Sequence, residues 1–210
     1  MLNIHSLNFD YSDRPLLRGV NFSLNKGVLL HLRGKNGSGK TTLLKLLAGL
    51  MRPSHGDIRY GEHSIYDDVA RYQKNICYVG HKSGVSQVLT VRENCRFELV
   101  SSFSNLPLKK ASRCGLTVDD LMKAFSLDSI EDVACGLLSV GQRRRVGLLR
   151  LLMSDASLWL LDEPLVALDE ETICILMTYL NQHLSTGGQV ILTSHQPLPV
   201  QPQHYQEYCL

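Results

Sequence analysis

Short apolar runs alternate with helical patterns along most of the chain. Four runs have the length and character of buried strands. They cover residues 28–32, 76–79, 157–161 and 189–193. The first run is followed by a leucine-rich segment, residues 41–50, whose spacing predicts a helix that ends before Pro53. Buried strands that alternate with helices predict an α/β fold built on a parallel sheet.

Residues 2–11 show a different pattern, in which apolar and polar side chains alternate with one slip. Alternation is typical of a strand with one buried face, and we expect an edge strand in an amino-terminal antiparallel β region. At the other end of the chain, residues 196–210 contain three prolines. This tail is expected to be an extended end and not a regulatory domain.

Residues 86–154 interrupt the alternation of strands and helices. Thr90 and Glu93 have the spacing of a capping box, which predicts a helix that runs toward Ser101. Two further helices are predicted over residues 117–126 and 141–153. We therefore expect one domain with an inserted helical subdomain. Residues 1–85 and 155–210 form its core, and residues 86–154 form the insertion.

Composition and charge exclude several classes of protein. The chain has 210 residues, 44% of them hydrophobic, and a formal net charge of +2, so it is neither disordered nor fibrous. So small a charge gives no electrostatic case for nucleic acid as a partner. The six cysteines include no C-x-x-C pair, which favours free thiols over a zinc site or a disulfide framework. No signal peptide or membrane-spanning stretch is recognisable, so a role at a membrane would require a partner.

The most specific motif follows the first buried run and fits G-x-x-x-x-G-K-[ST]. With the next threonine it comprises Gly34, Lys35, Asn36, Gly37, Ser38, Gly39, Lys40, Thr41 and Thr42. Glycines let such a loop wrap closely around phosphate groups, and the helix that follows offers free amide groups. Lys40 is expected to reach the β- and γ-phosphates and the Thr41 hydroxyl to bind Mg²⁺. The alternative, a simple glycine turn, does not explain the strand and helix around it.

Two carboxylates follow the apolar run that ends at Leu161. Ligands bind α/β sheets at the carboxyl ends of the strands, which is where Asp162 and Glu163 are expected to lie. Asp162 suits the Mg²⁺ shell as a Walker B aspartate, and Glu163 suits the activation of a water molecule. A solvated acidic turn is the alternative interpretation.

Residues 138–142, LSVGQ, precede the helix predicted over 141–153. Ser139 suits the N-cap of that helix, where its hydroxyl and the first amides can also face an anion. Taken with the two preceding motifs, this segment makes the sequence resemble the nucleotide-binding subunits of ABC transporters. Residues 166–169 resemble the D-loop of that family, and residues 193–195 resemble the strand end that carries its switch histidine.

The ABC resemblance implies a P-loop NTPase core of the RecA-like type that hydrolyses ATP with Mg²⁺. It implies that Tyr11 stacks on adenine, that Glu163 acts as general base and that His195 holds the γ-phosphate. It further implies a head-to-tail homodimer with ATP at the interface. The second protomer would contribute Ser139, Gly141 and Gln142 to each site.

Four segments narrow the resemblance to the CcmA-type ATPases of haem exporters in bacterial cytochrome c maturation. They are residues 78–81, 89–94, 141–146 and 191–196. This narrower resemblance implies integral membrane partners of the CcmB/CcmC kind. It also implies a peripheral position on the cytoplasmic face of the inner membrane.

Two features are left open by the sequence. His81 stands where ABC proteins usually carry the Q-loop glutamine, and it either binds nucleotide or is a strand-end histidine without nucleotide contact. The arginines Arg143, Arg144 and Arg145 either cover a solvated helix face or contact the partner protomer or a membrane subunit.

Alternative functions remain open as well. One is the ATPase of a different ABC exporter or importer. Another is a soluble ABC ATPase that acts on nucleic acid or ribosomes, although such proteins are typically longer. A non-hydrolysing cassette would lack Lys40 or Glu163, and a P-loop kinase would have no use for LSVGQ.

Overall fold

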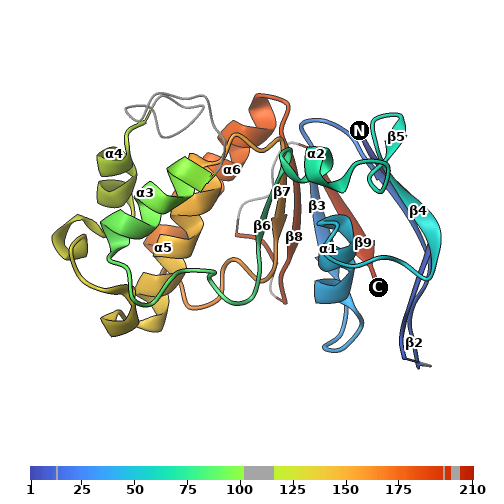
Figure 1. Cartoon of the computed structure of the whole chain (residues 1–210), viewed down its shortest axis with the longest axis horizontal. Coiled ribbons are helices and arrows are strands. Elements are labelled where there is room, and N and C mark those ends of the chain that lie inside the picture. Colours follow the sequence, from blue (N-terminus) through green and yellow to red (C-terminus); the bar gives the residue numbers. More distant parts are fainter. Residues whose placement is uncertain (13, 102–115, 196, 200–203) are drawn as a thin grey trace.

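The computed structural model describes residues 1–12, 14–101, 116–195, 197–199 and 204–210. Its strands form two sheets, one antiparallel and one parallel, and a group of helices lies beyond the parallel sheet (Figure 1). The predicted α/β fold is confirmed. Within the described residues, no helix combines the length and the apolar character that crossing a membrane requires.

The antiparallel sheet is built from the amino-terminal part of the chain. Its strand order is β2-β1-β4-β5. The strands are β1 (Leu2–Tyr11), β2 (Arg14–Leu24), β4 (His55–Tyr60) and β5 (His63–Ser64). The predicted edge position of residues 2–11 is wrong, because β1 pairs with β2 on one side and with β4 on the other. An alternating pattern indicates that one face of a strand is buried. It does not indicate whether the strand pairs with one neighbouring strand or with two.

The parallel sheet has the strand order β6-β7-β8-β3-β9. The strands are β3 (Leu29–Arg33), β6 (Ile76–Val79), β7 (Leu158–Leu161), β8 (Gln189–Thr193) and β9 (Tyr205–Cys209). The four predicted buried runs are therefore β3, β6, β7 and β8. Part of the tail that is predicted as an extended end forms β9, which pairs in parallel with β3.

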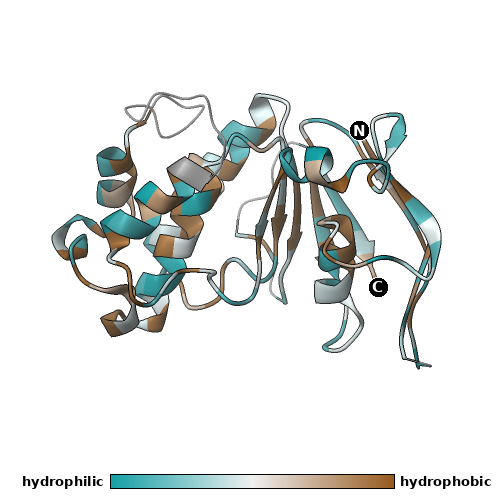
Figure 2. Cartoon of the chain, viewed as in Figure 1, coloured by the Kyte–Doolittle hydropathy of each residue, from teal (hydrophilic) through white to brown (hydrophobic). Residues whose placement is uncertain are grey.

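The strands β3, β7 and β8 are buried on both faces, which is why they are mostly apolar (Figure 2), whereas β9, at the end of the sheet, has a mixed burial pattern. Leu158 and Leu160 of β7 pack with the antiparallel sheet and with α1 (Lys40–Leu47). Trp159 and Leu161, on the opposite face, pack with the helices of the second layer. The helix α1 therefore fills the space between the two sheets, directly after β3.

The second layer contains the helices predicted from residues 86–154. They are α3 (Val91–Ser101), α4 (Val118–Ala124) and α5 (Val140–Met153), with the 3₁₀ turns η1 (Asp128–Ile130) and η2 (Cys135–Leu137). The remaining helices are α2 (Val69–Gln73) and α6 (Glu170–Ser185). Thr90 and Glu93 exchange the two hydrogen bonds of the predicted capping box, at 2.8 and 3.2 Å.

Candidate active site

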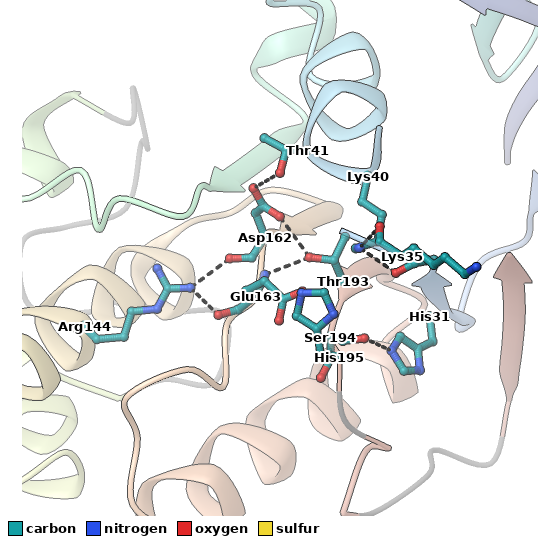
Figure 3. Close-up of polar contacts among 11 residues, drawn as sticks. His31, Lys35, Lys40, Thr41, Arg144, Asp162, Glu163, Thr193, Ser194 and His195 are labelled. Atoms are coloured by element: carbon teal, nitrogen blue, oxygen red, sulfur yellow. Dashed lines mark hydrogen bonds and ion pairs between the residues drawn. The ribbon is translucent and has the colours of Figure 1, made fainter. Parts of the chain in front are cut away.

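The glycine-rich loop joins β3 to α1 and folds over the side chain of Lys40. The Lys40 Nζ donates hydrogen bonds to the carbonyls of Gly34, at 2.7 Å, and Lys35, at 3.1 Å (Figure 3). Lys40 and Thr42 are buried in α1, while Lys35, Asn36 and Gly37 are exposed at the tip of the loop. The loop therefore presents its backbone to solvent and keeps one cation beneath it.

The backbone of this loop requires glycine at the start of α1. Gly39 is the N-cap of the helix, with φ of +99°, and a Cβ there would lie 2.7 Å from the Leu17 Cδ2. No side chain caps the first amides of α1. The Ser38 Oγ is buried and has no hydrogen-bond partner among the described residues. Uncapped amides, an unpartnered hydroxyl and a buried lysine together fit a phosphate group.

Asp162, at the carboxyl end of β7, has both carboxylate oxygens engaged by hydroxyl groups. Thr41 of α1 donates to its Oδ2 at 2.8 Å, and Thr193 of β8 donates to its Oδ1 at 2.9 Å. Asp162 is only 2% exposed. A hydroxyl and a carboxylate in contact are oxygen ligands of the kind Mg²⁺ takes beside substrate phosphates.

Glu163 has a backbone conformation that non-glycine residues rarely adopt, with φ of +51°. Hydrogen bonds hold both of its backbone polar groups. Its amide donates to the Thr193 Oγ1 at 2.8 Å, and its carbonyl accepts from the Arg144 Nη2 at 2.7 Å. Backbone strain of this kind costs on the order of 1–3 kcal/mol. It persists where surrounding contacts hold the residue in place, and such residues are often found at functional sites.

The side chain of Glu163 lies next to His195. Its Oε1 is buried without a hydrogen bond among the described groups, and the His195 Nε2 lies 3.4 Å away. The His195 side chain is half exposed, whereas that of Glu163 is mostly covered. A buried carboxylate oxygen beside an imidazole, at the edge where β3, β7 and β8 end, is suited to bind and deprotonate a water molecule.

A hydrogen bond from His31 of β3 holds the residue that precedes His195. The His31 Nε2 lies 3.3 Å from the carbonyl of Ser194, and its Nδ1 lies 2.8 Å from the hydroxyl of Tyr205 in β9. Burial lowers the pKa of His31, which favours the neutral ring. A carbonyl only accepts, so the Nε2 carries the proton of the hydrogen bond to Ser194.

Within the described part of the chain, the start of α5 and the phosphate loop line two different cavities. Ser139 is the N-cap of α5 and shares a capping box with Gln142, with hydrogen bonds of 2.8 and 3.1 Å. A cavity of about 540 Å³ is lined by Val140, His81 and Glu163 among others. A separate cavity of about 530 Å³ is lined by Gly34, Lys35, Ser38 and His195 among others.

Comparison with known proteins decides the family. The family model described as "ABC transporter" matches residues 17–166. A CcmA cytochrome c biogenesis ATP-binding export protein from Legionella pneumophila (strain Lens) is 50% identical over 210 residues, all of both chains. The chain belongs to the ABC transporter family, in its CcmA group.

Other relatives agree with this assignment. The Haemophilus influenzae protein of the same description is 37% identical and covers 94% of this chain and 90% of its own. The solved structure of an ABC transporter ATP-binding protein from Pyrococcus furiosus has a TM-score of 0.80 and 25% identity, covering 98% of this chain and 96% of its own. An ATP-binding cassette described as dimeric and post-hydrolysis, bound to ADP and phosphate, has the same fold, with a TM-score of 0.77 and 22% identity, covering 93% of this chain and 88% of its own. The chain is an ATP-binding and ATP-hydrolysing subunit of the ABC type.

Two residues expected at the nucleotide in ABC proteins lie on open positions here. Tyr11 ends β1, is 52% exposed and stacks edge-to-face on Phe9 with ring centroids 5.1 Å apart. His81 follows β6 and is exposed. Gly141 instead packs against its own chain, because a Cβ there would lie 2.8 Å from the carbonyl of Ala167 in the segment that resembles the D-loop. The role of each of these residues toward nucleotide stays a prediction.

In the arginine run, Arg144 does not lie on a solvated helix face, and contact of the run with a partner protomer or a membrane subunit stays a prediction. Arg144 is buried, 6% exposed, and donates to backbone carbonyls that include those of Asp162 and Glu163. Arg143 donates to the carbonyl of Leu138 at 2.7 Å, and Arg145 to that of Phe125 at 3.0 Å. Sequence reasoning therefore missed Arg144 as a site residue, together with Thr193 and His31. The signal for the last two was a polar residue inside an apolar strand.

Proposed function

We propose that two copies of this chain bind two ATP molecules between them, head to tail. In each composite site Lys40, Thr41, Asp162, Glu163 and His195 come from one protomer, and Ser139, Gly141 and Gln142 come from the other. The observation that carries this proposal is the position of Ser139. It is an exposed helix cap, and among the described residues the cavity at the tip of α5 is separate from the cavity that the phosphate loop lines. A second chain would supply the phosphate group that the tip of α5 can bind.

The residues divide the chemistry of hydrolysis among themselves. Lys40 and the amides of α1 would stabilise charge on the phosphates, and Thr41 and Asp162 would hold Mg²⁺, which neutralises phosphate charge when bound. Glu163 would accept a proton from the attacking water, and His195 would hold the γ-phosphate. Loss of the γ-phosphate removes the group that both protomers contact, so hydrolysis would loosen the dimer.

A dimerisation experiment tests the composite site. The Glu163→Gln variant keeps the ATP contacts and removes the base, so with MgATP it should elute from a sizing column at the mass of a dimer. Adding either Lys40→Ala or Ser139→Arg to this variant should abolish the ATP-dependent dimer. Ser185→Arg, a change at an exposed serine near the end of α6, is the matched control and should preserve it. A Glu163→Gln protein that stays monomeric with MgATP, or dimers that survive Ser139→Arg, would refute the proposal.

The same proposal includes a transport role like that named for the relatives. ATP-driven dimerisation would act on integral membrane subunits of the CcmB/CcmC kind, at the cytoplasmic face of the inner membrane. The complex would export or handle haem for cytochrome c biogenesis, and α3, α4 and α5 would belong to a helical subdomain beside the core. The similarity over full length to CcmA proteins supports this role. Co-purification of small multi-spanning proteins with a haem-handling protein is the expected result, whereas recovery of ribosomes would contradict it.

A further inference from the structure

The buried side chain of Arg144 joins three parts of the candidate active site. Its Nη1 donates to the carbonyl of Gly80, at 2.9 Å, where the chain leaves β6 toward His81. Its Nη2 donates to the carbonyls of Asp162, at 2.9 Å, and Glu163, at 2.7 Å, at the end of β7 (Figure 3). Arg144 itself belongs to the first turns of α5, the helix that Ser139 caps.

Only a guanidinium group matches this arrangement of acceptors. Its donors lie in one plane and point along fixed directions, so one side chain can bind carbonyls from two separate loops. In the part of the chain that the structure describes, Arg144 forms no ion pair with a carboxylate. Its two Nη nitrogens instead bind backbone carbonyls and so fix the positions of those peptide groups, while its buried Nε has no hydrogen-bond partner among the described residues. A lysine carries its three donors on one nitrogen, so it can bind only carbonyls that converge on one point and cannot place two separate nitrogens at the two loops.

The helix α5 is also fastened to the loop after β6 by two further contacts. A Cβ at Gly147 would lie 2.8 Å from the carbonyl of Ser83, so helix and loop approach too closely for any side chain there. Arg150 donates to the carbonyl of Gly84 at 3.3 Å. The helix and this loop therefore shift together, and Arg144 extends the connection to Glu163.

We propose that Arg144 is a positioning residue that holds Glu163 in its left-handed conformation and couples it to the helix tip that carries Ser139. This inference rests on the composite site proposed above, in which Glu163 and Ser139 of one chain serve different ATP molecules. A displacement of α5 at one site then moves the carboxylate of the other. Arg144 is buried and its Nη2 binds the carbonyl of Glu163, so it acts through the peptide group of that residue.

Chemical rescue of the ATPase activity of the full-length protein tests the positioning role. Arg144→Ala should lower kcat at least about tenfold, because the Glu163 peptide loses a charge-assisted hydrogen bond and the carboxylate loses its fixed position. The KM for ATP should change less than about threefold, because the phosphate loop is untouched. Millimolar guanidinium chloride should restore part of the lost kcat by filling the same place, and equal sodium chloride should not. Arg143→Ala is the matched control and should gain nothing from guanidinium, because the Arg143 side chain binds the carbonyls of Gly136 and Leu138, away from Glu163.

Arg144→Lys separates a loss of positioning from a loss of folding, in case Arg144→Ala does not fold. It keeps the charge and most of the volume, and it should stay folded by circular dichroism with kcat still lowered severalfold. Wild-type kcat in Arg144→Lys, or a loss in Arg144→Ala that guanidinium does not rescue, would overturn the inference. These outcomes are independent of the composite site. A Glu163→Gln protein without ATP-dependent dimers refutes the proposed function, whereas an unrescued Arg144→Ala refutes only the positioning role.

Discussion

The hydroxyl of Thr193 donates to the Asp162 carboxylate at 2.9 Å, and the same oxygen accepts the amide of the residue after Asp162 at 2.8 Å. One buried hydroxyl on β8 thus fixes both the carboxylate that would hold Mg²⁺ and the backbone of Glu163. Thr193 is fully buried, with 0% exposure, so water cannot replace these hydrogen bonds.

Replacing this hydroxyl by a methyl group tests its importance. Thr193→Val keeps the shape and leaves the Glu163 amide without an acceptor, which should lower the free energy of unfolding by about 1–3 kcal/mol. It should also lower kcat about tenfold, because Glu163 loses one of its two backbone anchors. Urea unfolding and steady-state ATPase assays measure the two effects. Thr193→Ser, which keeps the hydroxyl, is the control, and equal kcat in the valine and serine variants would contradict this account.

The buried imidazole of His31 predicts a loss of stability in mild acid. Burial lowers its pKa in the folded protein, while the unfolded chain titrates near the ordinary value of about 6.5. Below that pH the unfolded state binds more protons than the folded state. The contribution of His31 is therefore complete above the unfolded pKa and is lost as the pH falls toward and through the folded pKa.

Unfolding curves at pH 7.5 and pH 5.5 test this pH dependence. The wild-type protein should lose more stability between these two values than His31→Gln, whose side chain does not titrate. His5→Gln, which changes an exposed histidine on β1, should leave the pH dependence unchanged. If His31→Gln and the wild type lose the same free energy between the two pH values, the buried ring is not the source of the acid sensitivity.

Tyr11 predicts an effect on ATP affinity without an effect on the chemical step. Its ring is 52% exposed at the end of β1, where an adenine can stack on it. Stacking of an aromatic ring on a base contributes about 1–3 kcal/mol. Tyr11→Ala should therefore raise the KM for ATP at least fivefold, roughly the lower bound of that range, with kcat unchanged. Tyr11→Phe keeps the ring and should behave as wild type, so an alanine variant with wild-type KM would remove Tyr11 from the site.

The parts of the fold that could be predicted are those in which one strand or helix carries its own signal. The runs that became β3, β6, β7 and β8 are apolar because both sheet faces are buried, and such a pattern is visible locally. The position of residues 2–11 between two neighbours could not be predicted, because pairing with β2 and β4 depends on distant residues. The pairing of β9 with β3 was hidden for the same reason, since its burial pattern is mixed.

In the candidate site, too, the residues that could be predicted are those that lie in a local sequence motif. Lys40, Asp162 and Ser139 lie in motifs whose residue types and spacing reflect phosphate and metal chemistry, so sequence was enough to select them. Arg144 looked like one of three similar arginines. What distinguishes it is the direction of its side chain, toward β6 and β7, and that direction follows from the packing of α5 in three dimensions. Contacts from a side chain to distant backbone carbonyls leave no residue pattern for a single sequence to show.

The exposed position of His81 predicts that its side chain can be replaced by the usual glutamine of the family. Its backbone carbonyl lies 3.4 Å from the Arg144 Nη1 in the buried network, and a side-chain change leaves that carbonyl in place. The side-chain amide of glutamine has a donor group and an acceptor group, as a neutral imidazole does, and the two side chains are similar in length. His81→Gln should therefore keep kcat and the dissociation constant for MgATP within about twofold of the wild type. His81→Ala removes the polar group and tests whether it takes part in hydrolysis, with a lower kcat at unchanged ATP affinity as the expected result. Loss of nucleotide binding in His81→Gln would show instead that the ring supports the loop structurally.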